Sequence, residues 1–305
     1  MDQINEVTII GAGPAGIAAA IYLKRAELHP TILEKNEPGG LLKNAYLVEN
    51  YPGFPGGISG GTLIEQFVEQ LHTVGLSITK SVVKHVHHHN DKFLIETDQG
   101  CLVSSAIIIA SGTTPKKLEI PGSASIESTR LFYDPRSIPL KENGAKKRIL
   151  VIGGGDIAFD YTLTLLKWGH TVTIISRSKP TCLPLLQARV IKNGATIHTM
   201  CVPEKIVEHR EEILLRCRRN NHVEELSADF ILVACGRDPN TSFLSPTLKK
   251  CFNNPSDIPK TSIPGLFFAG DVIRGPYRQT GIAVGDGIHA AMMVEHYLRK
   301  RLVKP

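Results

Sequence analysis

Residues 7–16 read Val-Thr-Ile-Ile-Gly-Ala-Gly-Pro-Ala-Gly, and residues 149–158 read Ile-Leu-Val-Ile-Gly-Gly-Gly-Asp-Ile-Ala. Each stretch is an apolar run of strand type followed by small residues spaced G-x-G-x-x-G or G-x-G-x-x-A. A helical run follows each fingerprint, over 17–25 and to about Trp168, and a second strand-like run follows each helix. Strand, tight glycine turn, helix and strand form a βαβ unit. The chain therefore contains two such units.

Two fingerprints of this kind predict an α/β protein with two Rossmann-like (three-layer ββα) dinucleotide-binding domains, the second inserted in the first. In the first fingerprint, Gly11 permits the turn, Gly13 lets a pyrophosphate approach, and Gly16 lets the helix pack on its strand. Free N–H groups and the helix dipole at the start of the helix attract the phosphates. Glu34 ends the next strand, where a carboxylate binds the hydroxyls of an adenosine ribose. Pro14 and Ala15 complete this loop.

The second fingerprint, with Gly153, Gly155 and Ala158, differs at the ribose position. Ser176 stands where the first unit has Glu34, and Arg177 follows it. A carboxylate would repel a 2′-phosphate and a guanidinium would pair with it, so this site favours NADPH over NADH. The alternative is that these basic residues belong to an ordinary solvated loop. Two further residues complete the expected loop, Asp156 and Ile157.

Composition excludes several classes of protein. The 305 residues carry a formal charge of +6, and no apolar run approaches the roughly 18 residues of a membrane span. Because the charge is mild and dispersed along the chain, we expect no nucleic-acid partner. A mildly basic surface could instead steer an acidic protein or an anionic cofactor. The N-terminus lacks a basic leader and the six cysteines form no C-x-x-C, which predicts a cytoplasmic protein with reduced thiols. His85, His87 and His89 would share one face of a strand. No set of carboxylates and cysteines surrounds them to complete a ligand shell, so we expect no metal site there.

The chain resembles the low-molecular-weight thioredoxin reductase family over nearly its whole length. Besides the two fingerprints, the matching stretches are Val48–Gly53, Ile107–Gly112, Gly236–Thr241, Phe268–Asp271 and Tyr277–Gln279. The resemblance implies FAD in the first domain, NAD(P)H in the second, and a homodimer. It places FAD contacts at Gly40, Leu41, Asn50, Ala110, Gly112, Gly270, Asp271, Arg278, Gln279 and Thr280, and an NAD(P) contact at Gly236.

Three departures from the family pattern bear on the reaction. The family's redox C-x-x-C is expected between Gly122 and Arg148, where this chain has Thr129–Arg136 and no cysteine. The basic cofactor signature is reduced to Ser-Arg-Ser, and Leu41 replaces a glutamine. Without the dithiol, the chain resembles the related ferredoxin (flavodoxin):NADP reductases. Those enzymes usually carry an extra C-terminal segment over the flavin.

These observations predict an FAD domain over residues 1–117 and 242–305 and an NAD(P) domain over 118–241. We expect an oxidoreductase that reduces its flavin with NAD(P)H and passes electrons to an external acceptor, since thiol relay needs two cysteines. Ferredoxin, flavodoxin and a quinone are candidate acceptors. Two alternatives stay open: a flavin- or nucleotide-binding sensor or assembly protein without turnover, and a disulfide reductase that uses Cys182 or a partner's cysteine. Cys235 is expected to be inert core packing.

Overall fold

The computed structural model describes residues 4–140, 144–209, 212–220, 222–252 and 261–302, which form two compact units. Unit 1 comprises Met1–Lys43, Val48–Thr114 and Asp238–Pro305, and unit 2 comprises Asn44–Leu47 and Pro115–Arg237. Two of the four crossings lie in β7 (Thr113–Pro115) and β16 (Arg237–Pro239), which pair with each other. The crossings fall a few residues before the domain boundaries predicted from the sequence. The assignment of residues 44–47 to unit 2 was not anticipated.

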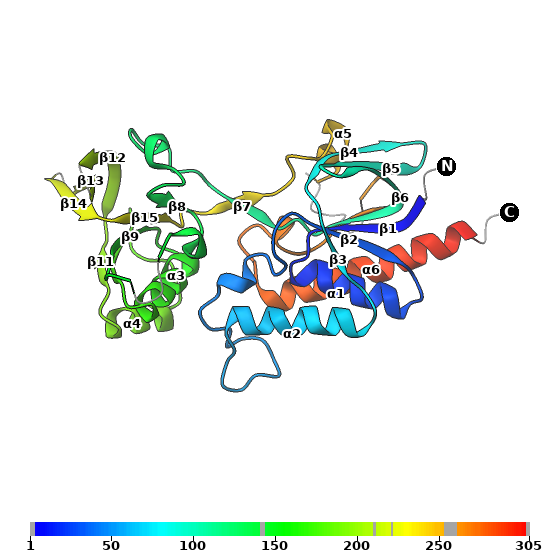
Figure 1. The fold of residues 1–305 in the computed structure, drawn as a ribbon, viewed down its shortest axis with the longest axis horizontal. Helices are drawn as coiled ribbons and strands as arrows, with labels where there is room; N and C mark the ends of the chain where they lie inside the picture. Colours follow the sequence, from blue (N-terminus) through cyan, green and yellow to red (C-terminus); the bar gives the residue numbers. More distant parts are fainter. Residues whose placement is uncertain (1–3, 141–143, 210–211, 221, 253–260, 303–305) are drawn as a thin grey trace. The chain divides into compact units, whose positions relative to one another are not determined.

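Unit 1 is built on a seven-stranded sheet in the order β3-β2-β1-β6-β5-β4, with β17 added beside β6 (Figure 1). Its strands are β1 (Ile4–Ile10), β2 (Pro30–Glu34), β3 (Ile78–Lys80), β4 (Val83–His89), β5 (Lys92–Thr97), β6 (Gly100–Ile109) and β17 (Leu266–Phe268). Its helices are α1 (Pro14–Arg25), α2 (Gly60–Thr73), α5 (Pro246–Phe252) and α6 (Thr280–Leu302). The sheet is parallel around β1, where both faces are covered and apolar residues run without alternation.

Packing of α1 places the first glycine loop. Strand β1 runs parallel between β2 and β6, so its carboxyl end and the N-terminus of α1 lie at the edge where ligands bind in such sheets. On its apolar side α1 buries Ile17 and Leu23, and α6 packs along it. Gly287 of α6 approaches so closely that a Cβ there would lie 2.1 Å from the Ala15 carbonyl oxygen. The two helices therefore hold the loop between them.

Unit 2 repeats this plan with a five-stranded parallel sheet in the order β11-β10-β9-β15-β8. The sheet strands are β8 (Leu131–Phe132), β9 (Arg148–Ile152), β10 (Thr171–Ile175), β11 (Thr196–His198) and β15 (Phe230–Val233). A second, antiparallel sheet contains β12 (Cys201–His209), β13 (Glu212–Arg219) and β14 (His222–Ala228). Helices α3 (Asp156–Lys167) and α4 (Pro184–Lys192) cover one face. The 3-10 turns are η2 (Ala124–Ile126) and η3 (Pro135–Ser137), with η1 (Leu42–Asn44) and η5 (Gly270–Val272) elsewhere.

The fold confirms the predicted α/β architecture with two dinucleotide-binding units. In unit 1, β4 continues to His89, and the turn that joins it to β5 is Asn90-Asp91, both at positive φ. His85, His87 and His89 alternate with inward-facing Val86 and His88. Among the residues described, no cluster of His, Cys, Asp and Glu has a geometry for a metal ion, and no helix has the length and apolarity to cross a bilayer.

Candidate functional site

The first glycine loop needs its glycines for steric reasons. Gly11 has φ +105°, and a Cβ there would lie 2.4 Å from the Ala110 carbonyl oxygen. A Cβ on Gly16 would lie 1.9 Å from the Gly11 carbonyl oxygen. Neither contact is possible, so both positions exclude any side chain. The turn of the fingerprint is therefore held by close backbone contact, as the sequence predicted.

Gly13 leaves open space at the start of α1. It is the N-cap of the helix, and a Cβ built on it would meet nothing within 4 Å. No side chain caps this helix and its first turn contains no acid. Pro14, at the first helical position, has no N–H to satisfy. The remaining amides are thus available to an anion, and this cradle fits the pyrophosphate of FAD.

Glu34 is fixed beside this cradle. One carboxylate oxygen accepts a hydrogen bond from the Ala12 amide at 2.8 Å, and the other accepts from the Asn36 amide at 3.0 Å. Opposite, Gly39 donates its amide to the Ala12 carbonyl oxygen at 2.8 Å, and a Cβ built on Gly40 would lie 3.7 Å from the Gly13 Cα. The carboxylate predicted to bind ribose hydroxyls is therefore attached to the loop that would hold the phosphates.

Ala110, Gly112 and Gly270 stand at the same edge of the sheet. Ala110 donates to the Ile10 carbonyl oxygen at 2.9 Å, and Gly112 (φ +65°) accepts from the Asn240 amide at 3.0 Å. Gly270 has φ +77°, and a Cβ there would lie 2.8 Å from the Ala15 side chain. This brings the Ala-Gly-Asp segment against the N-terminus of α1.

A partly buried ion pair supports that segment, and sequence reasoning missed it. Asp286 of α6 is 7% exposed, accepts from the Gly270 amide at 3.3 Å, and accepts two hydrogen bonds from the Arg274 guanidinium, one of them at 2.8 Å. Arg274 in turn accepts, through its carbonyl oxygen, the Tyr277 amide at 2.8 Å. The residues are twelve positions apart on a loop and a helix, so no local pattern signals the pair.

The start of α6 joins two predicted flavin contacts. Asn50 donates its side-chain amide to the Gln279 side-chain oxygen at 2.9 Å, across 229 residues of sequence. Helix α6 begins at Thr280, and Ala283 donates to the Gln279 carbonyl oxygen at 2.9 Å. The positive end of this helix suits the edge of a flavin where charge accumulates on reduction. Leu41, Asp271 and Arg278 also lie in unit 1.

The second glycine loop repeats the steric argument in unit 2. Gly153 has φ +154°, and a Cβ there would lie 2.5 Å from the Ala234 carbonyl oxygen and 3.0 Å from Ala158. Gly155 caps α3 without a side-chain bond. Ala158, at 0% exposure, takes the place of the third glycine. Ile157 is half-buried behind it, and Gly236 (φ +109°) ends the neighbouring β15 segment.

A short segment, Thr181–Leu183, crosses this loop, and no pattern in the chain indicates this contact. Thr181 donates its amide to the Gly154 carbonyl oxygen at 2.8 Å. Leu183 donates its amide to Asp156, the acid in the first turn of α3, also at 2.8 Å. Cys182 between them is buried, and burial raises the pKa of its thiol. A buried thiol with a raised pKa disfavours the alternative in which Cys182 takes part in disulfide reduction.

The ribose position of the second site is closed around Ser176. This residue is 2% exposed, and a Cβ on Gly154 would lie 2.4 Å from its hydroxyl oxygen. Arg177 and Lys179 beyond it are exposed. The end of β10 therefore buries a small hydroxyl and exposes the cations that follow it, an arrangement that accepts a 2′-phosphate more readily than a carboxylate would.

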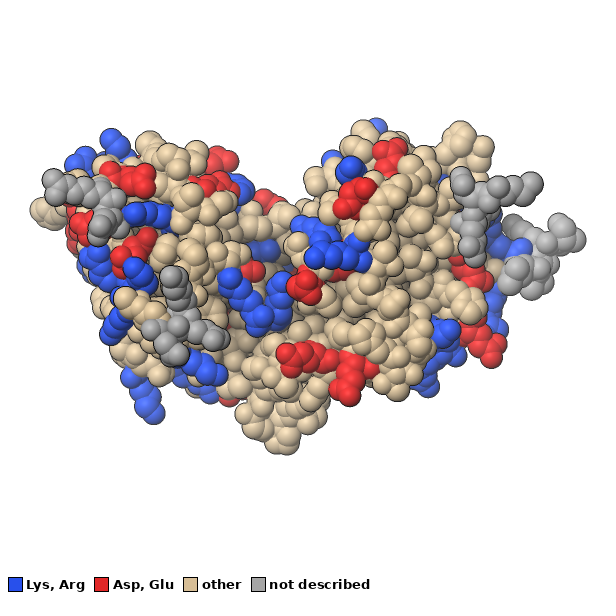
Figure 2. All heavy atoms as spheres, viewed as in Figure 1, with Lys and Arg blue, Asp and Glu red and all other residues tan. Residues whose placement is uncertain are grey.

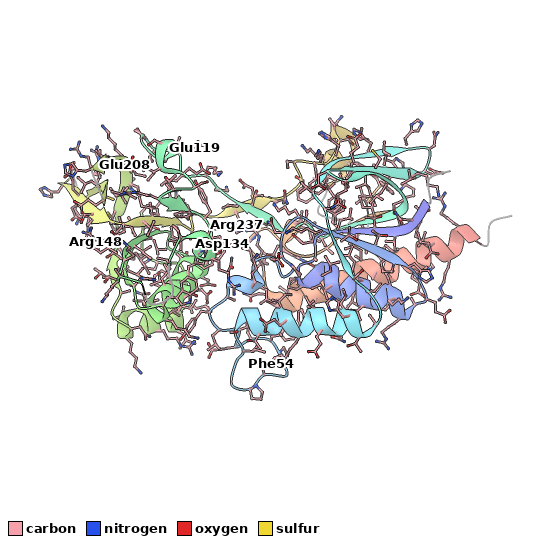
Figure 3. The ribbon with its side chains drawn as sticks, viewed as in Figure 1. Phe54, Glu119, Asp134, Arg148, Glu208 and Arg237 are labelled. Carbon is pink, nitrogen blue, oxygen red and sulfur yellow. The ribbon has the colours of Figure 1, made fainter. Side chains whose placement is uncertain are left out.

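The segment where the family resemblance leads one to expect a redox dithiol carries a carboxylate. Asp134 caps η3 by accepting the Arg136 amide at 2.8 Å, and also accepts the Asn44 side-chain amide at 3.0 Å (Figure 3). Next to it, Asp160 of α3 accepts the Tyr46 amide at 2.9 Å. Burial, opposed by this hydrogen bond and reinforced by Asp156, raises the pKa of Asp160 to about 6. Residues 44–47 are thus bound to unit 2 by two acids.

The cysteines give no exposed pair. Cys201 and Cys217 lie on adjacent strands β12 and β13, are both 0% exposed, and hydrogen-bond each other. Burial raises the pKa of both thiols, which disfavours the reactive thiolate. Cys235, expected in the core, follows β15 and is exposed, although its thiol donates to the Ile152 carbonyl oxygen and partial burial raises its pKa. That expectation was wrong because the strand ends at Val233.

Comparisons with known proteins agree with the fold described above. A family model described as pyridine nucleotide-disulphide oxidoreductase matches residues 5–287. Thioredoxin reductase 2 of Arabidopsis thaliana is 33% identical, over 97% of this chain and 82% of the relative. The 34.2 kDa protein in the rubredoxin operon of Clostridium pasteurianum is 31% identical, over 96% and 97%. The solved thioredoxin reductase of Lactococcus lactis (FR conformation) superposes with a TM-score of 0.87 at 31% identity, covering 97% of this chain and 99% of that one.

Proposed function

Because the chain belongs to the pyridine nucleotide-disulphide oxidoreductase family, we propose that it oxidises NADPH and passes the electrons by way of FAD directly to an external acceptor, without a dithiol of its own. The family and the thioredoxin reductase relatives make it an FAD-dependent NAD(P)H oxidoreductase. The observation that carries the finer proposal is Asp134, a carboxylate at the cap of η3 in the segment where a redox dithiol is expected.

The residues of the chain bind and orient the two nucleotides. The α1 amides, Glu34 and the Ala-Gly-Asp segment would hold FAD, and the α3 loop with Arg177 would hold NADPH. When bound, FAD supplies the hydride-accepting chemistry. Positioning is then the main contribution of the protein, since the chemistry belongs to the cofactors.

The acceptor is proposed to be a small redox protein or a quinone. The absence of cysteine over residues 123–147 and the burial of Cys201 and Cys217 support electron transfer without sulfur. The name of one relative refers to a rubredoxin operon, which agrees with a redox-protein acceptor. A cytoplasmic location stays a prediction of the sequence.

We expect the working form to be a homodimer. A cavity of about 210 Å³ lies among α1, α2 and α6, lined by apolar residues such as Ile17, Ile21 and Phe67. Ile282, Ile288 and Met292 of α6 are exposed. An apolar face of this kind is typical of contact with a second copy.

Anaerobic mixing tests the proposal. NADPH should bleach the flavin absorbance of the holoprotein faster than NADH, and ferredoxin or menadione should restore it while oxidised thioredoxin does not. Treatment with N-ethylmaleimide should leave menadione reduction unchanged, because no thiol takes part. Loss of activity on alkylation would favour the thiol alternative, and a flavin that neither nucleotide bleaches would favour a sensor.

A further inference from the structure

The basic residues are dispersed along the sequence, but the division of the chain into two units places the whole net positive charge in unit 2. Unit 2 contains 19 Lys and Arg against 13 Asp and Glu, whereas unit 1 contains 16 of each. Within unit 2, the stretch from Tyr161 to Pro203 contains no Asp or Glu. Its basic residues are Lys167, Arg177, Lys179, Arg189 and Lys192. The stretch from Tyr161 to Pro203, which contains β10, α4 and β11, thus carries a net charge of +5, against +6 for the whole chain.

The same stretch exposes large apolar side chains. Of those in the described part of unit 2, all but Val223 lie between Trp168 and Val202. Leu183 is 58% exposed, Leu185 53% and Ile191 56%, and Trp168 at the end of α3 is 43% exposed. Water contact with such side chains is unfavourable by about 25 cal/mol per Å² of apolar area, so their gathering within one stretch of the chain needs an explanation.

Helix α4 presents two of these side chains, Leu185 and Ile191, on its outer side. Its inner side buries Val190 completely and packs Leu186 against the core of unit 2. A surface helix normally places polar residues opposite its buried stripe. Here Leu185, Ala188 and Ile191 are exposed instead, with Lys192 next to them. Figure 2 shows basic side chains standing out on the corner of the molecule where α4 lies in Figure 1.

From these observations we infer that the α4 face, defined as Leu185, Ala188, Ile191 and Lys192, is a docking surface for a small acidic redox protein. The inference rests on the proposed function and names the class of its acceptor. An apolar centre excludes water from the contact, and a surrounding positive field steers an acidic partner towards it. The absence of any acid over residues 161–203 removes the charges that would repel such a partner.

The α4 face is separate from the nucleotide contacts proposed above. Leu183 belongs to the segment that crosses the second glycine loop, because its amide bonds Asp156, and is left out of the face for that reason. Leu185, Ile191 and Lys192 have no part in the cofactor machinery described. Substitutions there can therefore change docking without changing the reduction of the flavin by NADPH.

A binding measurement on the FAD-loaded protein tests the inference without requiring turnover. The probes are a plant-type [2Fe–2S] ferredoxin and a flavodoxin, both small acidic redox proteins, immobilised on a sensor surface. The test variant is Ile191→Ser/Lys192→Glu, and the matched control is Val223→Ser/Lys205→Glu, which alters an equally exposed apolar and basic pair outside the face. Menadione reduction by NADPH is followed in parallel for all three proteins.

We expect the wild-type protein and the control to bind at least one probe, with a Kd that rises steeply between 50 and 300 mM salt, on the scale of a contact of several charges. The Ile191→Ser/Lys192→Glu variant should bind at least about tenfold more weakly, with a shallower salt dependence and unchanged menadione reduction.

Three results would overturn the inference: neither probe binds, the variant and control weaken binding equally, or heparin and duplex DNA bind the face as tightly as the probes. Conversion of a dimer into a monomer by the Ile191→Ser/Lys192→Glu substitution would assign the face to a second copy instead. Failure of NADPH to reduce menadione in every protein would refute the proposed function while leaving the binding result to decide the docking surface.

Discussion

Asp160 makes the stability of unit 2 depend on pH in an unusual direction. Burial raises the pKa of its carboxyl from 3.8 to about 6, although the Tyr46 amide opposes the shift. Ionisation in the folded state therefore costs about 3 kcal/mol more than in the unfolded chain, at 1.36 kcal/mol per pKa unit. Between about pH 4 and pH 6 the folded protein holds a proton that the unfolded chain has released. Its contribution to stability is thus greatest at low pH and is lost as the pH rises to about 6.

The substitution Asp160→Asn isolates this effect. Asparagine keeps an oxygen that accepts the Tyr46 amide but cannot ionise. The free energy of unfolding should rise by up to about 3 kcal/mol at pH 8 and stay unchanged near pH 4. Urea unfolding followed by the fluorescence of Trp168, the single tryptophan and a residue of unit 2, measures this directly.

Glu208→Gln is the matched control, because that acid lies on the surface beside Arg130 and its removal should leave the pH profile of stability unchanged (Figure 3). An Asp160→Asn variant whose gain in stability over wild type is the same at pH 4 and pH 8 would refute the reasoning. So would an Asp160→Asn variant that is less stable than wild type at pH 8.

Three further predictions follow from the two sites. Gly16→Ala should destabilise unit 1 by about 1–3 kcal/mol and abolish FAD binding, because its Cβ would lie 1.9 Å from a carbonyl oxygen; Gly13→Ala, whose Cβ meets nothing, should lose FAD but keep the thermal stability of the apoprotein. Asp286→Asn leaves Arg274 without its carboxylate and should cost about 1.5 kcal/mol in chemical unfolding, because the guanidinium is partly exposed, so a loss below about 0.5 kcal/mol would contradict the ion pair. Arg177→Glu should lower kcat/KM for NADPH at least about tenfold relative to NADH, and an unchanged ratio of the two constants would remove Arg177 from the 2′-phosphate site.

The sequence predicted the glycine loops well because their requirement is local. Gly11 and Gly153 are needed by a turn of a few residues, and the steric contact that excludes a side chain is made by a neighbouring strand whose identity hardly matters. The fold class followed, since two such turns in βαβ context leave few alternatives. The position of Glu34 beside the first loop could be predicted for the same reason, and its contact with a ribose stays a prediction.

What the sequence did not show depends on tertiary contact. Asp286 and Arg274 meet only because α6 returns along α1, and the Thr181 segment reaches the second loop only because α4 packs beside α3. Cys235 was misplaced since its apolar neighbours continue the strand pattern beyond the last paired residue. Side chains that act through long-range packing leave no periodic trace in the chain.

The assignment of Asn44–Leu47 to unit 2 has a practical consequence for protein engineering. A chimera that exchanges only residues 115–237 with those of a relative would separate Asp134 and Asp160 from the Asn44 and Tyr46 groups they bind. A functional exchange must therefore include residues 44–47 together with residues 115–237. The boundaries of the inserted unit depend on the hydrogen bonds it makes to this distant segment as well as on where the chain enters and leaves it.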